Sequence, residues 1–227
     1  MKKKLKKYLK YYKKKNIYNI KEALYILKKY NFTNFISSIN LSINLLKKKR
    51  DNLLIKKNIY LPYSIGNKYR ILVLIDKIYR DNIKKLGINL VGGLKYIKKI
   101  ELNNFLNFDI IFSNEYYMKY LLKLSKILGK KNLIPNYDND TIINELNYLK
   151  ILKKYIKGKN LLIKTDKFGI IHLKIGNIKL DEKKIIKNYL YIIKIINNIK
   201  FENKKLKIKN IYINTTMSPS LKLLLKF

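Results

Sequence analysis

The chain has 227 residues and a formal net charge of +38, from 52 lysines and arginines against 14 aspartates and glutamates. This length suits one large or two small domains, and the abundance of Ile, Leu, Phe and Tyr excludes an intrinsically disordered chain. The sequence has no cysteine and one histidine, which excludes disulfides, thiolate chemistry and a histidine-rich metal site, and no apolar run approaches the ~18 residues of a membrane span.

The first third of the chain predicts two helices and then a half-buried strand. Lys2–Lys15 is basic with apolar residues at helical spacing, and Ile20–Tyr30 follows Asn19 as a candidate N-cap. Within the segment FISSINLSINLL, residues 38–45 alternate clearly between polar and apolar, which is typical of a strand with one buried face. The two faces of this strand are Ile39, Leu41, Ile43 and Leu45 against Ser38, Asn40, Ser42 and Asn44.

The middle of the chain predicts a small parallel α/β sheet. ILVLI (residues 71–75) is a continuous apolar run, as expected for a strand covered on both faces. Strand-like and helical segments then alternate as far as residue 156, which is typical of βαβ units. The expected strands are INLVGG and FDIIFS, and the expected helices span residues 78–86, 95–100, 115–128 and 142–156.

The last third returns to the half-buried antiparallel pattern. LLIKT and IIHLKIG are strand-like, and a helix is expected near Asp181–Asn198. KIKNIYINTT alternates again before the final SLKLLLK, with one side apolar and the other polar. The two sides are Ile211, Ile213 and Thr215 against Asn210, Tyr212, Asn214 and Thr216.

Two turn-rich segments separate these patterns. LPYSIGNKY contains Pro62 and Gly66, and IKGKN contains Gly158; we interpret these residues as hinge positions. The simplest organisation is an α+β domain made from both termini, residues 1–66 plus 159–227, interrupted by an inserted α/β domain, residues 67–158.

Signals for catalysis and cofactor binding are weak. VGG (91–93) lacks the G-x-G-x-x-G pattern, and LGKKN (128–132) lacks the G-K-[ST] of a phosphate-binding loop. A catalytic His172 would need a nucleophile or a carboxylate partner, and Asp166 and Asp181 are the nearest acids in sequence. A structural or RNA-facing histidine fits better. We expect no catalytic residue, no cofactor and no metal.

The positive charge favours a phosphate-bearing partner. One alanine, two valines and three arginines indicate a very AT-rich genome, as in a reduced symbiont or an organelle, so part of the lysine excess is genomic. The acids are still too few to neutralise the lysines, which predicts RNA or DNA contacts that add salt dependence without sequence choice. Two alternatives stay open. An RNA-modifying or RNA-processing α/β enzyme would need a cofactor loop or clustered acids, and a membrane-surface protein rests on charge alone.

The segment INTTMSPS (213–220) and several other blocks resemble the L-one family of large-subunit ribosomal proteins. NFISSINLSINL resembles that family's first RNA-facing strand, LPYSIGNKYR its Leu-Pro-His-Gly-x-Gly hinge, and FDIIFSNEYYM its Phe-Asp strand. ILGKKNLIPN is similar to the family's Leu-Gly-Pro-Arg-Gly-Leu-Met-Pro-Asn loop, and DKFGIIHLKIG to its Asp-Lys-x-Gly-Ile-Ile-His segment. The blocks keep the family's order from about residue 16 to residue 222.

This resemblance implies an α+β sandwich domain I interrupted by a Rossmann-like three-layer α/β domain II. It implies a non-enzymatic monomer in the ribosome, cytoplasmic or organellar, that binds large-subunit rRNA at the lateral stalk. It also implies contact with exit-site tRNA and repression of the chain's own mRNA. Ser218 replaces a family glycine. The RNA-binding residues implied by position are Phe35, Ser38, Asn40, Lys167, His172, Asn210, Thr215, Thr216, Met217 and Ser218.

Overall fold

The structure is a computed structural model, and it describes residues 16–46, 55–103, 106–201 and 204–225. The chain forms two compact units. Unit 1 is drawn from Met1–Gly66 and Leu161–Phe227, and unit 2 is Asn67–Asn160. The first boundary coincides with the expected one, and the second falls just after the expected residue 158. The helix expected over Lys2–Lys15 lies outside the described residues.

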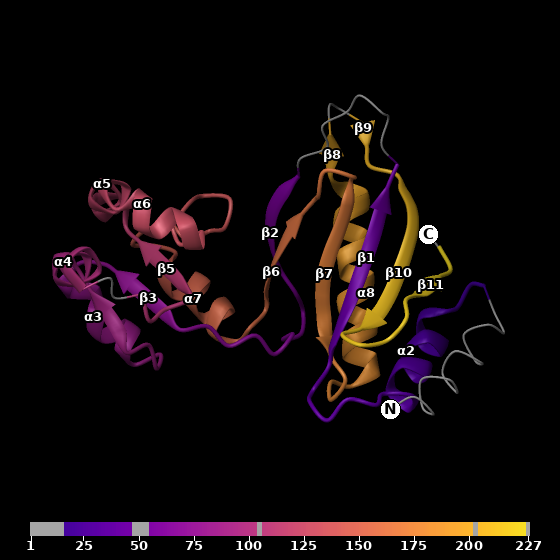
Figure 1. Ribbon diagram of the computed structural model, residues 1–227. Coiled ribbons are helices and arrows are strands. Elements are labelled where there is room, and N and C mark those ends of the chain that lie inside the picture. Colours follow the sequence, from indigo (N-terminus) through magenta and orange to yellow (C-terminus); the bar gives the residue numbers. More distant parts are fainter. Residues whose placement is uncertain (1–15, 47–54, 104–105, 202–203, 226–227) are drawn as a thin grey trace. The chain divides into compact units, whose positions relative to one another are not determined.

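Unit 1 is built on a four-stranded antiparallel sheet in the order β11-β10-β1-β7 (Figure 1). Buried residues alternate with half-exposed or exposed ones along β1 and most of β7 and β10, so one sheet face is apolar and the other is polar. This confirms the predicted alternation in β1 and β10. The strands are β1 (Ser38–Leu45), β7 (Ile170–Asn177), β10 (Ile208–Thr215) and β11 (Leu221–Leu223).

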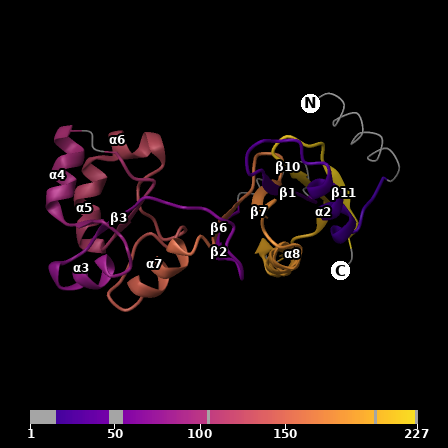
Figure 2. The same cartoon turned by 90° about the horizontal axis from the view of Figure 1, so that it is seen from below.

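Two helices cover the apolar face of this sheet, α2 (Ile20–Lys29) and α8 (Glu182–Asn198). Figure 2 shows α8 along one side of the sheet. The buried residues of α8 recur every three or four positions, as a helix against a core requires. Asn19 occupies the N-cap position of α2, but its side chain makes no capping hydrogen bond.

The chain leaves and re-enters unit 1 through two paired strands, β2 (Lys56–Tyr60) and β6 (Asn160–Lys164). Another short pair, β8 (Lys200–Phe201) and β9 (Lys204–Lys205), follows α8. Gly66 and Gly158 both have a positive φ, +76° and +59°. At Gly158 this conformation ends a helix, because Lys159 N–H donates back to Lys154 O in the usual glycine C-cap pattern.

Unit 2 is a three-layer α/β domain around a parallel sheet in the order β4-β3-β5. The central strand β3 (Ile71–Leu74) is buried throughout; its neighbours are β4 (Leu90–Gly92) and β5 (Ile110–Ser113). On one face Leu72 and Leu74 pack with α4 (Leu94–Asn103) and α5 (Glu115–Lys123). On the other lie α3 (Lys77–Lys84) and α7 (Tyr148–Ile156). The predicted fold class is confirmed.

Two helix predictions in unit 2 were wrong in extent. The helix expected over residues 115–128 divides at Leu124, where the chain tightens to an i→i−3 hydrogen bond, so α6 (Ser125–Leu128) and a 3₁₀ turn (Gly129–Lys131) follow α5. The helix expected from residue 142 begins only at Tyr148. Ile143 N–H donates to Ser113 O, so this part of the chain extends the parallel sheet instead.

Candidate nucleic-acid interface

The solvent-facing side of the unit 1 sheet presents mostly uncharged polar side chains on three adjacent strands. Their amides and hydroxyls can both donate and accept hydrogen bonds. The pairing register aligns them in rows across β10, β1 and β7; we call the following residues the polar face. The rows are Asn214–Asn40–Lys174, Tyr212–Ser42–His172 and Asn210–Asn44–Ile170.

Exposed apolar side chains, among them Phe35 and Met217, lie just beyond one end of the polar face. Phe35 precedes β1 and is 55% exposed, and Met217 follows β10 and is 52% exposed. The two segments are joined there by a hydrogen bond of 3.3 Å from Ser38 N–H to Thr216 Oγ1. This bond brings segments that are far apart in the sequence together at one end of the sheet, which we call the Phe35–Met217 end.

Ser218 fixes the turn that displays Met217. Its hydroxyl accepts a hydrogen bond from Thr215 N–H over 2.8 Å, and its own N–H donates to Thr215 O over 3.2 Å. Its backbone is not left-handed, so the turn does not require a glycine. A serine at this position therefore introduces no backbone strain.

His172 lies between two polar side chains, and one of them is within hydrogen-bond distance. Its Nδ1 lies 3.0 Å from Ser42 Oγ, and its Nε2 lies 3.9 Å from Asp166 Oδ2. The second distance is too long for a hydrogen bond, and Asp166 Oδ1 already accepts two backbone N–H groups in its own turn. The imidazole is 64% exposed on the sheet face. The trio resembles a Ser-His-Asp triad in residue types but not in geometry.

Most of the sequence-predicted residues come together in unit 1. Thr215 is different, because its side chain is only 2% exposed and faces the core. It supports the turn below Met217 and offers no hydroxyl to solvent, so we remove it from the candidate site. The residues on the polar face, at its ends or in the adjoining turns are Phe35, Ser38, Asn40, Lys167, His172, Asn210, Thr216, Met217 and Ser218.

The sequence prediction missed several members of the polar face, namely Ser42, Asn44, Lys174, Tyr212 and Asn214. The polar side of the two alternating strands contained the signal for four of them. The pairing of β1 with β7 and β10, which places them in rows, was not readable from either strand alone. Burial lowers the pKa of Lys174.

Comparison with known proteins assigns the family. A model of the "Ribosomal protein L1p/L10e family" matches residues 27–219. The chain belongs to this family. Bacterial relatives named "Large ribosomal subunit protein uL1" cover nearly the whole chain. The proteins of Mycoplasma genitalium and Mycoplasmoides gallisepticum are each 35% identical to this chain over 92% of its length, and the match covers 91% and 90% of their own lengths. The protein of Borrelia duttonii is 33% identical, and the match covers 96% of this chain and 96% of the relative.

Membership in the L1p/L10e family makes the chain a structural protein of the large ribosomal subunit, with the large-subunit rRNA as its partner, and not an enzyme. The alternative of an RNA-modifying or RNA-processing enzyme is therefore set aside. Within the described residues, no group of His, Cys, Asp and Glu could hold a metal ion. The helices of that same part of the chain include none that is long and apolar enough to cross a bilayer.

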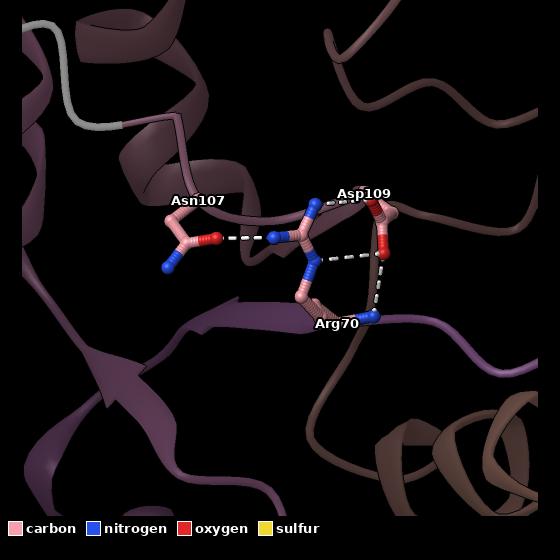
Figure 3. Close-up of polar contacts among 3 residues, drawn as sticks. All are labelled: Arg70, Asn107 and Asp109. Atoms are coloured by element: carbon pink, nitrogen blue, oxygen red, sulfur yellow. Dashed lines mark hydrogen bonds and ion pairs between the residues drawn. The ribbon is translucent and has the colours of Figure 1, made fainter.

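Unit 2 of this L1p/L10e-family protein contains an open cavity of about 550 Å³, lined by Arg70, Asn89 and Asn107 among others. It lies at the amino ends of β3 and β4, whereas ligands of open α/β sheets bind beyond the carboxyl ends. Arg70 is engaged structurally: it donates to both Asp109 oxygens and to Asn107 Oδ1 (Figure 3). We therefore interpret this network as a clamp joining the starts of β3 and β5.

Proposed function

We propose that this protein binds the stalk helix of the large-subunit rRNA through the polar face and the Phe35–Met217 end of unit 1. The observation that supports this is the exposure of Phe35 and Met217 at one end of the β1–β10 pair, joined by the Ser38–Thr216 hydrogen bond. Burying both side chains against a partner gains about 25 cal/mol for each Å² of apolar surface removed from water.

The chemistry of the polar face suits ribose more than phosphate. Small hydroxyl and amide groups on a sheet approach the shallow groove of an RNA helix and exchange hydrogen bonds with 2′-hydroxyls. Met217 and Phe35 pack against exposed nucleotides, and lysines around unit 1 hold the phosphates. Selectivity for the stalk helix then comes from the neutral groups, and affinity comes largely from the cations.

The experiment measures affinity for a stalk rRNA fragment and for an unrelated RNA hairpin over a salt series. Met217→Ala and Thr216→Ala should lose the difference between the two RNAs. Leu122→Ala in α5, where Leu122 is similarly exposed, is the matched control for Met217 and should keep it. Variants that still prefer the stalk fragment as strongly as the parent protein would contradict the proposal.

We infer two further partners by the same reasoning. Messenger RNA that folds like the stalk helix offers the same ribose edges, so the chain would repress its own translation. The test is competition, in which the rRNA fragment displaces a fragment of the chain's own messenger.

Exit-site tRNA would meet the basic surface, and ribosomes lacking the protein should release deacylated tRNA at a different rate.

We propose that the two crossings between the units are hinges. Pro62 and Gly66 lie in the first crossing, and Gly158 lies in the second. Gly158→Ala forces a side chain into a left-handed conformation and should destabilise this crossing. Crystal structures of the free and the RNA-bound protein test the hinge proposal, and the same orientation of the two units in both would count against it.

A further inference from the structure

The turn between β6 and β7 displays an aromatic ring in solvent. Phe168 is 80% exposed, and Lys167 beside it is also exposed. The turn is well fixed: Asp166 Oδ1 accepts Phe168 N–H over 2.9 Å and Ile170 N–H over 2.7 Å, and Gly169 has a φ of +78°. The phenyl ring is therefore held by a rigid backbone but contributes little to the core.

This turn adjoins the end of the polar face opposite to Phe35 and Met217. Leu45 N–H, at the end of β1, donates to Gly169 O over 3.1 Å. Asn44 stands opposite Ile170 at this end, while Ser38 stands opposite Asn177 at the other. At about 3.3 Å per residue, the eight residues of β1 separate the two ends by roughly 23 Å.

The far end repeats the chemistry of the Phe35–Met217 end. Leu46 follows Leu45 and is 52% exposed, so this end also has two exposed apolar side chains, Phe168 and Leu46. Exposed lysines flank them, because Leu46 N–H donates to the carbonyl of Lys207 and Lys167 belongs to the turn itself. The turn has one carboxylate, Asp166, whose Oδ1 accepts two backbone N–H groups and whose Oδ2 lies 3.9 Å from His172 Nε2.

We propose that Phe168 is a second RNA contact, on which an unpaired base stacks at the far end of the polar face. This inference rests on the proposed function, since it extends the same surface. An aromatic ring flanked by cations fits a base and its phosphates, because every base has a π-face and each phosphate a negative charge. A protein partner would place an apolar or acidic surface on the ring, and the test distinguishes an RNA partner from a protein partner.

The test compares the full chain with Phe168→Ala, Phe168→Leu and Phe168→Tyr on a stalk rRNA fragment. Loss of one stacked base should weaken binding by roughly 5- to 100-fold for Ala. Tyr should restore binding and Leu should not, because Leu is apolar but has no π-face. The dependence of affinity on salt should stay unchanged, since no cation is removed. Leu146→Ala, at a site 94% exposed in unit 2, is the matched control and should bind like the parent.

The outcomes separate this inference from the proposed function. If Met217→Ala weakens binding and Phe168→Ala does not, Phe168 is no RNA contact although the proposed function stands. If neither weakens binding, both are overturned. A fall in the melting temperature of Phe168→Ala would place the ring against the chain's own residues. Normal fragment binding with reduced incorporation into ribosomal subunits would place it against a protein. Either result overturns the inference.

Discussion

Arg70 is one of three arginines in a chain whose other cations are nearly all lysines. It donates to both oxygens of Asp109, at 3.2 and 2.8 Å, and its backbone N–H donates to Oδ2 over 2.9 Å. Arginine presents these donors in a rigid fork, whereas lysine offers a point charge. A composition biased against arginine therefore keeps one where the geometry of the fork is used.

Arg70→Lys should lower the thermal stability of the protein slightly, by at most a few degrees in melting temperature, because the pair is largely solvent-exposed. The measurement is a melting curve against Lys68→Arg, a charge-conserving control two positions earlier. An unchanged melting temperature for Arg70→Lys would show that the forked geometry of arginine adds nothing to thermal stability.

Asp109 gives the network a pH dependence of known sign. Hydrogen bonds from the Arg70 guanidinium and backbone hold the Asp109 pKa below its ordinary value. Its contribution to stability is therefore complete above about pH 4 and is lost as the pH falls through the lowered pKa. When the pH falls from 5 to 3, the unfolding free energy of the Asp109→Asn variant should decrease by less than that of the parent protein. Urea unfolding at each pH measures this difference. Equal losses would contradict this assignment.

Sequence and structure agree most closely for residues whose burial follows directly from the alternation of a strand. Ile43 and Ser42 could be assigned to opposite faces because a half-buried strand has a period of two. Thr215 shows the limit: its alternation placed it with the apolar residues, yet the family resemblance placed it among the RNA contacts. The burial of its side chain favours the alternation.

At the scale of elements, α8 contains a polar residue whose role the sequence did not reveal. Asn188 is fully buried on the apolar side of the helix. Its Oδ1 accepts Tyr63 N–H over 3.1 Å, and its Nδ2 donates to Tyr63 O and to Ile175 O over 3.2 and 3.1 Å. One side chain thus ties α8 to β7 and to the segment that follows β2.

Asn188→Ala should destabilise unit 1 by about 2–4 kcal/mol, because it leaves the buried Ile175 carbonyl and the partly buried backbone groups of Tyr63 without these partners. Lys194→Ala, an exposed position on the same helix, should change the unfolding free energy by less than about 0.5 kcal/mol. Chemical denaturation measures both, and faster hydrogen exchange at Tyr63 should accompany the first. Similar stabilities for the two variants would refute the bridging role.

Secondary structure was predictable for elements whose own pattern decides their conformation, such as β1, β3 and α8. It was not predictable for segments whose conformation is decided by hydrogen bonds to residues distant in the sequence. Residues 142–147 have helical spacing, but the bond from Ile143 to Ser113 draws them to the sheet. The same holds for the site: Phe35 and Met217 came from the family resemblance, whereas the row Tyr212–Ser42–His172 exists only through strand register.

For the whole molecule, the pairing of β2 with β6 has a direct consequence. The chain leaves unit 1 after one of these strands and returns through the other. Replacing residues 67–160 by a short Gly-Ser linker should therefore leave unit 1 folded and able to bind the stalk rRNA fragment. Circular dichroism and a binding titration test this, and a product that fails to fold would show that unit 1 depends on unit 2.

The net charge of +38 also acts at this scale. Lysine-to-alanine changes around the polar face should weaken binding to all RNAs alike. They should also flatten the salt dependence by roughly 0.7–0.9 for each phosphate that is no longer neutralised. Lys167→Ala and Lys207→Ala are the variants, and Lys126→Ala in unit 2 is the control. A Lys167 variant that changes the preference between two RNAs would instead make Lys167 a specificity residue.

The central position of β1 in its sheet has a consequence for synthesis. Both neighbours of β1, β7 and β10, are translated only after the whole of unit 2. At ~5–20 residues per second, β1 waits on the order of ten seconds for them. A nascent chain consequently has no assembled polar face until Thr215 has left the exit tunnel.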